Sequence, residues 1–361
     1  MGRVILRLSS FTVGFRLREA GMNGKKRLAL ALVLLLALLL FLRTADYSLR
    51  PDDESVRTRL EGFYAQPRDT LDVVFVGSSA AYAFFSPLRL YSQTGLTSAL
   101  YATPNQSIPM IRYILEECAR TQPGALYVVE LRPMLASHED NLLISADLRR
   151  LTDNMPWSLN RARCIEALAP DSDTLSWHFD LIKYHDRWSE VNPADLRLRW
   201  GHPDPDRGFQ IETGTEVIQG RDWSSINAVI PPEAENEAAL RDLLDYTRGR
   251  KMRLLFVATP FALSREQEKK YNAVGEIISE YGYEFLNMNR LLPELALDFD
   301  TDFSDFRHVN ILGAIKCTDC MGDVLRERTS PAGRADPSEW DEALEAYRHE
   351  EEAVAGMGDH L

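Results

Sequence analysis

The sequence predicts an α/β protein: a three-layer α/β/α, doubly wound and mostly parallel sheet, with an N-terminal transmembrane helix and a central insertion. Three observations predict this fold class. Short apolar runs alternate with segments of helical periodicity, which is the pattern of a parallel sheet covered by helices. Residues 28–42 form an unbroken apolar run, LALALVLLLALLLFL. Between residues 135 and 232 the alternation stops, and five of the six tryptophans lie there.

Composition and charge narrow the class of protein further. The chain has 361 residues, of which 45% are hydrophobic and 26% are charged, as in ordinary globular proteins. Residues 1–50 carry nine Lys/Arg and two Asp/Glu (+7), and the other 311 residues carry 32 and 52 (−20), which sum to the net charge of −13. An acidic body argues against nucleic acid as a partner. A basic start followed by an acidic body indicates a membrane boundary.

The apolar run predicts a membrane anchor over residues 28–43. Lys25, Lys26 and Arg27 precede the run and Arg43 follows it. Its fifteen residues would rise about 22 Å as a helix, and flanking arginine side chains can extend to the bilayer surface to close the gap. A cleaved signal peptide is the alternative interpretation, because such peptides have apolar regions of similar length. The anchor is favoured because no small-x-small cleavage site follows Leu42.

The positive charge before the run sets the expected topology. Lys and Arg stay on the cytoplasmic side, so residues 1–27 are expected in the cytoplasm and the body outside. The expected location is the cell membrane, with a single pass and an extracytoplasmic domain. Residues 44–70 are polar and predict a juxtamembrane stalk.

The body, residues 71–328, is expected to contain the sheet. Mostly apolar runs that are rich in β-branched and aromatic residues predict strands buried on both faces. These strands are predicted at residues 71–76, 98–102, 126–131, 252–258 and 283–287. Helices are predicted at residues 108–121, 233–249, 264–281 and 311–326. The stretch 135–232 is interpreted as an insertion or cap, and the acidic residues 329–361 as a loosely attached tail.

The first motif with chemical potential is Gly77-Ser78-Ser79, directly after the first strand. Glycine allows a sharp turn into a following helix, which exposes a serine hydroxyl beside free backbone N–H groups. The same turn also occurs in phosphate sites and in plain helix caps. By itself the motif therefore leaves catalysis, phosphate binding and capping open.

The second motif is Asp305-x-x-His308, which follows the last predicted strand. At this spacing a carboxylate can hold one imidazole nitrogen and leave the other to accept a proton from a serine. Ligands of doubly wound sheets bind at the carboxyl ends of the strands, and both motifs follow strand ends. The two motifs together therefore predict a Ser-His-Asp arrangement.

The chain resembles the SGNH (GDSL-type) hydrolase family. Within it, the chain is most similar to the membrane-anchored branch that modifies cell-envelope polymers, which includes the D-alanyl transfer proteins of lipoteichoic acid synthesis and the alginate-type O-acetyltransferases. The resemblance spans about residues 71–328. It is carried by four blocks, residues 74–79 (VFVGSS), 106–109 (QSIP), 130–133 (ELRP) and 305–313 (DFRHVNILG).

The resemblance implies roles for individual residues. Ser79 matches the nucleophile, His308 the general base and Asp305 the residue that orients the base. The Ser79 backbone N–H after Gly77 would donate to the oxyanion, and Asn105 lies where the family places a glycine or asparagine near it. Two positions depart from the family pattern: Ser78 replaces an acidic residue, and the block ELRP stands where a Gly-x-Asn-Asp block is usual.

Two further features of the sequence have two interpretations each. Arg132, at the end of a strand, could hold an anionic polymer or form a structural salt bridge. Trp177, His178, His185, Arg187 and Trp188 could line a groove for a sugar polymer or form the core of the cap. The four cysteines show no zinc spacing, and neither a metal nor another cofactor is expected.

These observations lead to an expected function. The chain is expected to be an extracytoplasmic serine acyl-transfer enzyme, either an O-acyltransferase or an esterase, that acts on ester-linked acyl groups of an envelope polysaccharide or a teichoic-acid-like polymer. A multi-pass membrane acyltransferase is an expected partner. The alternative is a non-catalytic protein that binds a glycan or helps to assemble such a partner. A third interpretation is a secreted lipase or carbohydrate esterase.

Overall fold

The body is built on a five-stranded parallel sheet with the strand order β2-β1-β3-β4-β5. The computed structural model describes residues 23–50, 54–142, 144–170, 174–191 and 203–358. The strands are β1 (Val73–Gly77), β2 (Ser98–Ala102), β3 (Leu126–Glu130), β4 (Leu254–Ala258) and β5 (Glu284–Asn287). This confirms an α/β fold with a parallel sheet, and each strand lies where the sequence predicts it.

Burial explains why these segments form strands. Every residue of β1, β2, β3 and β4 is buried, which matches their continuous apolar runs, whereas β5 at the sheet edge is only partly buried. The chain places β2 on one side of β1 and then adds β3 on the other side. The strand order therefore reverses at β1, and a crevice for ligands is expected beside the carboxyl end of such a strand.

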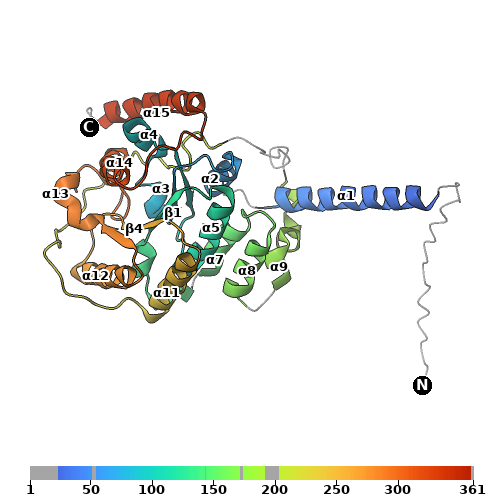
Figure 1. Ribbon diagram of the computed structural model, residues 1–361, viewed down its shortest axis with the longest axis horizontal. Coiled ribbons are helices and arrows are strands. Elements are labelled where there is room, and N and C mark those ends of the chain that lie inside the picture. Colours follow the sequence, from blue (N-terminus) through green and yellow to red (C-terminus); the bar gives the residue numbers. More distant parts are fainter. Residues whose placement is uncertain (1–22, 51–53, 143, 171–173, 192–202, 359–361) are drawn as a thin grey trace, which may run out of the picture.

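Helices pack on both sides of the sheet. Figure 1 shows α4 and α14 above the sheet and α11 and α12 below it. On the first side α4 packs against α14, and on the second α5 packs against α11, which also contacts α12. These helices are α4 (Pro87–Thr94), α5 (Ile108–Thr121), α11 (Ala234–Gly249), α12 (Arg265–Glu280) and α14 (Ile311–Arg326). All except the short α4 were predicted from the sequence.

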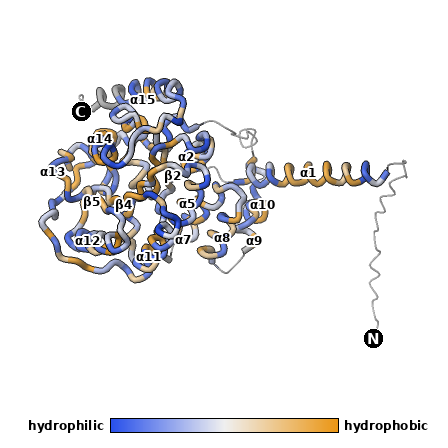
Figure 2. Tube along the Cα trace, viewed as in Figure 1, coloured by the Kyte–Doolittle hydropathy of each residue, from blue (hydrophilic) through white to orange (hydrophobic). Residues whose placement is uncertain are grey.

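Helix α1 (Gly24–Ser48) projects from the body (Figures 1 and 2). Its 25 residues rise about 37 Å, so the helix extends beyond the apolar run at both ends. Its apolar side chains from Leu28 to Phe41 are exposed. Among the described residues, α1 is the one helix that is long and apolar enough to cross a membrane. Such a helix suits a membrane anchor or a signal sequence.

The residues expected to form a stalk are instead part of the body. After α1, helix α2 (Glu54–Ala65) packs against β2. Its apolar side chains at Val56, Leu60 and Phe63 are fully or almost fully buried. Their spacing of four and three residues places them on one helix face, which the high content of charged residues in this segment concealed. The prediction of a stalk over residues 44–70 is therefore wrong for residues 54–65.

The stretch predicted as an insertion contains short helices up to residue 189 and irregular chain from residue 203, and both parts contribute to the main core. Buried residues of this stretch, such as Leu148, Leu151, Trp177 and Phe209, belong to the same hydrophobic cluster as the sheet. Its helices are η1 (Arg132–Leu135), α6 (His138–Leu142), α7 (Ile144–Thr152), α8 (Leu159–Leu168), α9 (Thr174–His178), α10 (Asp180–Lys183) and η2 (His185–Ser189). Two short helices, η3 (Met288–Leu291) and α13 (Leu292–Leu295), follow β5.

The acidic C-terminal segment is not loosely attached, contrary to the sequence prediction. It forms helix α15 (Pro337–Gly358), which packs against α4 and α14. Trp340, Leu344 and Tyr347 lie on one face of α15 and are buried. The Trp340 ring lies 5.2 Å from the Tyr91 ring, and the Arg207 guanidinium lies 4.7 Å from the Trp340 ring. Three apolar anchors at a spacing of three or four residues are enough to dock this otherwise acidic helix.

Replacing Trp340 with alanine is expected to lower the free energy of unfolding by about 3–5 kcal/mol, because the substitution leaves a cavity between α15 and α4. Urea denaturation followed by circular dichroism measures this change. The matched control is Glu342→Ala, an exposed position on the same helix, which is expected to leave the midpoint unchanged. Equal midpoints for both variants would mean that α15 does not stabilise the body.

Candidate functional site

Ser79 is presented at the carboxyl end of β1. Ser78 caps the short helix α3 (Ser79–Tyr82), and its side-chain oxygen accepts a hydrogen bond from the N–H of Ala80. Ser79 is therefore the first residue of the helix, where backbone N–H groups have no acceptor within the helix. The Ser78 hydroxyl is turned to the buried Glu130 carboxylate, 3.2 Å away. The second serine of the motif is thus left to face the site.

Gly77 is required at the turn by close packing. A Cβ atom at this position would lie 2.7 Å from the Cβ of Glu130 and 3.0 Å from the Cβ of Ala81. The absence of a side chain therefore allows β1 to approach β3 while the chain turns into α3. Gly77 shapes the turn that positions Ser79.

A short loop between η3/α13 and α14 presents the other two residues. Phe303 and Val309 form an antiparallel bridge across the loop, and the N–H of Ser304 donates to the carbonyl of His308 at 2.9 Å. The Asp305 Oδ1 atom accepts hydrogen bonds from the N–H groups of Arg307 at 2.7 Å and His308 at 2.9 Å. These contacts hold the carboxylate so that its second oxygen, Oδ2, faces the imidazole.

The three residues form a continuous chain of hydrogen bonds. His308 Nδ1 lies 2.8 Å from Asp305 Oδ2, and His308 Nε2 lies 2.7 Å from Ser79 Oγ. An ionised carboxylate can only accept, so Nδ1 carries a proton and, in a neutral ring, Nε2 accepts from the hydroxyl. Residues 229 positions apart are joined here in the order that proton transfer from a serine requires. The structure brings together all three residues that the sequence predicted.

The hydrogen-bond partners of Asp305 stabilise its ionised form. Partial burial acts to raise the pKa of this carboxyl group, but hydrogen bonds from the His308 ring and from the Arg307 N–H outweigh it and hold the pKa below its usual range. The group is therefore ionised at neutral pH. It can keep the imidazole in one orientation and stabilise a positive charge that develops on it.

Arg132 supports the histidine loop from the end of β3. Its Nη1 donates to the carbonyl of Arg307 at 2.5 Å, and its Nη2 donates to Thr259 Oγ1 at 2.8 Å. The guanidinium also lies over the rings of Phe84 and Phe261, at 5.1 Å and 4.6 Å. Burial lowers the pKa of this side chain. These contacts give Arg132 a structural task, and it also lines the cavity beside Ser79.

Glu130 is buried beneath the site. Its Oε1 accepts hydrogen bonds from the N–H of Arg132 at 2.7 Å and from Thr259 at 3.3 Å, while Oε2 accepts from Ser78. Burial raises the pKa of this carboxyl group, although Arg132 acts against the change. One side chain thus links the ends of β1, β3 and β4.

A cavity of about 330 Å³ opens beside Ser79 and His308. Asn105 lines it in a left-handed backbone conformation, with φ of 50°, and Asp147 lines the same cavity. Gln106 also lines it and is fully buried, and neither its amide nitrogen nor its amide oxygen has a hydrogen-bond partner among the described residues. A buried, unpaired amide is costly unless a ligand or a small movement satisfies it.

Other cavity residues carry no signal that sequence reasoning could use. Asp140 and Asp147 belong to α6 and α7 of the insertion, and Phe261 and Gln267 follow β4. Single residues of this kind belong to no recognisable motif. The aromatic cluster proposed as a groove does not line this cavity. Trp177 is buried against Arg149, with the guanidinium 3.8 Å from its ring, and Trp188 is exposed.

Comparisons with known proteins add no assignment. No protein-family model matches the chain, and a search of the curated proteins finds no match. Within the described ranges, no group of three or more His, Cys, Asp or Glu side chains is arranged to hold a metal ion. A function for this site is therefore inferred from its geometry.

Replacing Gly77 with alanine is expected to lower the free energy of unfolding by about 1–3 kcal/mol, because the added methyl group overlaps Glu130. Gly249→Ala is the matched control, since a Cβ at that helix end meets no atom within 4 Å. Thermal unfolding measures both. A Gly77→Ala variant as stable as Gly249→Ala would show that the turn does not depend on this contact.

The stabilising effect of Asp305 is expected to depend on pH. A carboxylate whose pKa is lowered by folding stabilises the fold above its ordinary pKa, and this stabilisation is lost as the pH falls through the lowered value. Asp305→Asn is therefore expected to destabilise the protein most near pH 7, with a difference from the parent that shrinks below about pH 4. Urea titrations across this range measure the difference. Asp300→Asn, a nearby exposed carboxyl, is the control, and a pH-independent difference would contradict the prediction.

Proposed function

We propose that this protein is a membrane-anchored serine acyl-transfer enzyme of the SGNH hydrolase type, with its domain outside the cytoplasm. The observation that carries the proposal is the hydrogen-bonded chain from Ser79 through His308 to Asp305, with distances of 2.7 Å and 2.8 Å. The hydroxyl, imidazole and carboxylate atoms that would take part in the proton transfer are within hydrogen-bond reach of their neighbours in this chain. The parallel sheet, the site at strand ends and the apolar α1 also support the proposal.

The proposed reaction has two steps that share one base. Ser79 Oγ attacks the carbonyl carbon of an acyl ester while His308 Nε2 takes its proton, and Asp305 holds the imidazolium that forms. The tetrahedral intermediate collapses to an acyl-serine, and the leaving alcohol takes the proton from His308. A second hydroxyl then attacks the acyl-serine while His308 takes its proton. The bond between the acyl carbon and Ser79 Oγ breaks, and His308 returns the proton to Ser79 Oγ. The Ser79 N–H is the proposed first donor to the oxyanion.

The second acceptor decides between the two outcomes of this chemistry. Water gives an esterase, and a hydroxyl of an envelope polysaccharide or a teichoic-acid-like polymer gives an O-acyltransferase. Helix α1 favours transfer, because an anchor would hold the site near such a polymer and near a multi-pass acyltransferase that supplies acyl groups. Asn105 and Arg132 are proposed to contact the substrate from the cavity wall.

The serine is expected to react with a fluorophosphonate probe. The full chain in detergent micelles should gain one adduct by intact mass, and Ser79→Ala should gain none. Ser92→Ala, an exposed serine on α4, is the matched control and should label like the parent. Asp305→Asn is expected to slow labelling by about 10⁴-fold, because the asparagine favours the wrong imidazole tautomer.

The opposite result would have a clear meaning. A folded parent chain without an adduct, or one that labels equally after Ser79→Ala, would contradict an activated Ser79. The non-catalytic role in binding a glycan or a membrane partner would then be preferred. Circular dichroism of each variant separates loss of reactivity from loss of fold.

A further inference from the structure

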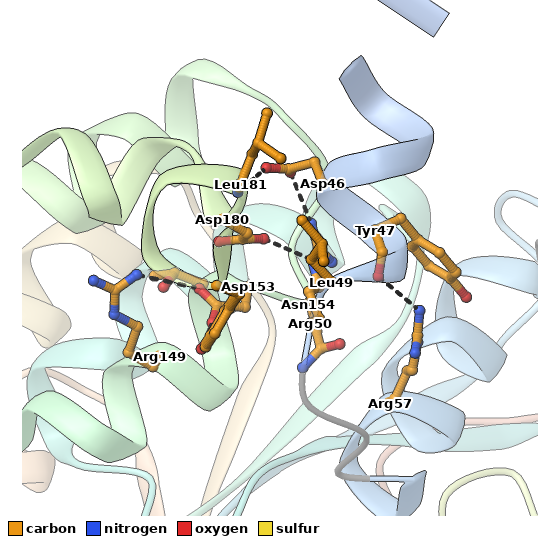
Figure 3. Close-up of polar contacts among 12 residues, drawn as sticks. Asp46, Tyr47, Leu49, Arg50, Arg57, Arg149, Asp153, Asn154, Asp180 and Leu181 are labelled. Atoms are coloured by element: carbon orange, nitrogen blue, oxygen red, sulfur yellow. Dashed lines mark hydrogen bonds and ion pairs between the residues drawn. The ribbon is translucent and has the colours of Figure 1, made fainter. Parts of the chain in front are cut away.

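The end of α1 is joined to the insertion by a buried ion pair and a hydrogen bond. Arg50 Nε lies 2.6 Å from Asp180 Oδ2 on α10, and the Asp180 side chain is completely buried (Figure 3). On the same side of the helix, Asp46 Oδ1 accepts a hydrogen bond from the N–H of Leu181 at 2.8 Å. Separating these partners would leave a buried charge without compensation, which is strongly unfavourable.

Further contacts hold the same junction from other directions. Arg187 of η2 donates to the carbonyl of Leu49 at 2.8 Å. From α2, the Arg57 guanidinium lies 3.8 Å from the Tyr47 ring and donates to the Tyr47 carbonyl. The end of α1 is therefore fixed to α2, α10 and η2 together. Because α1 is fixed to the body, its direction determines which face of the body would lie nearest to a membrane that α1 crosses.

Exposed apolar side chains gather in the part of the body that holds α1. Outside α1, nine large hydrophobic side chains are exposed in the described residues, and six of them lie between residues 157 and 188. We call these six residues the apolar patch. They are Trp157, Leu159, Leu175, Phe179, Ile182 and Trp188, with exposed fractions from 42% to 76%.

The members of the patch belong to elements that contact one another. The rings of Trp157 and Phe179 meet edge to face at 5.9 Å. Helix α8 packs against α9, α9 against α10, and α10 against both η2 and the end of α1. Figure 1 shows α8 and α9 at the end of the body from which α1 projects. The patch therefore lies beside the base of the apolar helix.

We propose that the apolar patch inserts into the interface of the bilayer that α1 crosses, so that the body is held by a second, monotopic contact. This inference rests on the proposed membrane anchor. Tryptophan is enriched at the headgroup level of membranes, and transfer of leucine, isoleucine and phenylalanine side chains from water to this region is favourable. The patch lies beside the base of α1. Lys183, which follows Ile182 in the chain, is exposed and can meet lipid phosphates.

Two attachments would constrain the body more than α1 alone. A single helix allows rotation about its axis and tilting of the body around its end. The Arg50–Asp180 ion pair opposes bending at the junction, and the patch would oppose lifting of the neighbouring face. The cavity beside Ser79 would then stay at one height and one orientation above the bilayer.

The test uses tryptophan fluorescence of the full chain in lipid vesicles. Helix α1 contains no tryptophan, so quenching by lipid bromine reports on the body. All variants carry Trp200→Phe, because Trp200 lies outside the described residues. Vesicles of phosphatidylcholine and phosphatidylglycerol are compared with the same lipids brominated near the headgroup, and only protein that floats with the vesicles is measured.

Brominated lipid is expected to quench the parent, and the double variant Trp157→Phe, Trp188→Phe is expected to lose most of that quenching. The matched control is Trp340→Phe, buried on α15, which should keep it. A second variant, Leu159→Asp with Leu175→Asp, keeps every tryptophan and should also lose quenching, because charges at these exposed positions would lift the patch from the lipid.

The contrary outcomes are distinguishable. Protein that floats but is not quenched overturns this inference, leaves the anchor standing and points to a membrane protein as the cover of the patch. Quenching that survives both patch variants also overturns it. Protein that does not float overturns the anchor and this inference together. Fluorophosphonate labelling of the same samples reports on Ser79 independently of all three outcomes.

Discussion

The hydrogen bond between His308 and Ser79 is the contact on which the site depends. Each of the two residues is held in position by a different part of the fold. Ser79 is held by a turn that works because Gly77 lets β1 lie against β3. His308 is held by a loop whose carbonyl at Arg307 is bound by Arg132. The two halves meet where the loop before α14 reaches the carboxyl end of β1. The fold therefore acts as the fixed frame of the site.

A polar network of Glu130 and Arg132 lies beneath the site. The hydrogen-bond partners of these two side chains explain why the fold tolerates their burial. Glu130 and Arg132 would each be costly to bury without a partner. Here one carboxylate accepts hydrogen bonds from Ser78, Thr259 and the backbone of Arg132, while the guanidinium binds Thr259 and a loop carbonyl. The network connects three strand ends, so a displacement of one strand end would disturb hydrogen bonds at the other two. Rigidity of this kind is what a preorganised site requires.

The sequence predicted what depends on local pattern and missed what depends on tertiary partners. The strands, α1 and the helices α5, α11, α12 and α14 follow from continuous apolar runs and helical periodicity. The triad follows from two short motifs, one directly after β1 and one directly before α14. The burial of Val56, Trp340 and their neighbours was missed, because few apolar anchors lie within charged segments. Asp147 at the cavity could not be assigned, since its position depends on how the insertion packs.

Helix α1 and the candidate site are linked through the insertion, and this bears on the choice of acceptor in the proposed reaction. Asp180 fixes α1 to α10, while Asp140 and Asp147 of the same insertion line the cavity. The chain segment that orients the body is therefore also a wall of the site. A soluble esterase has no need for this coupling, because its substrate arrives from any direction. An enzyme that passes an acyl group from a membrane donor to a polymer gains from it, because both partners approach from fixed directions.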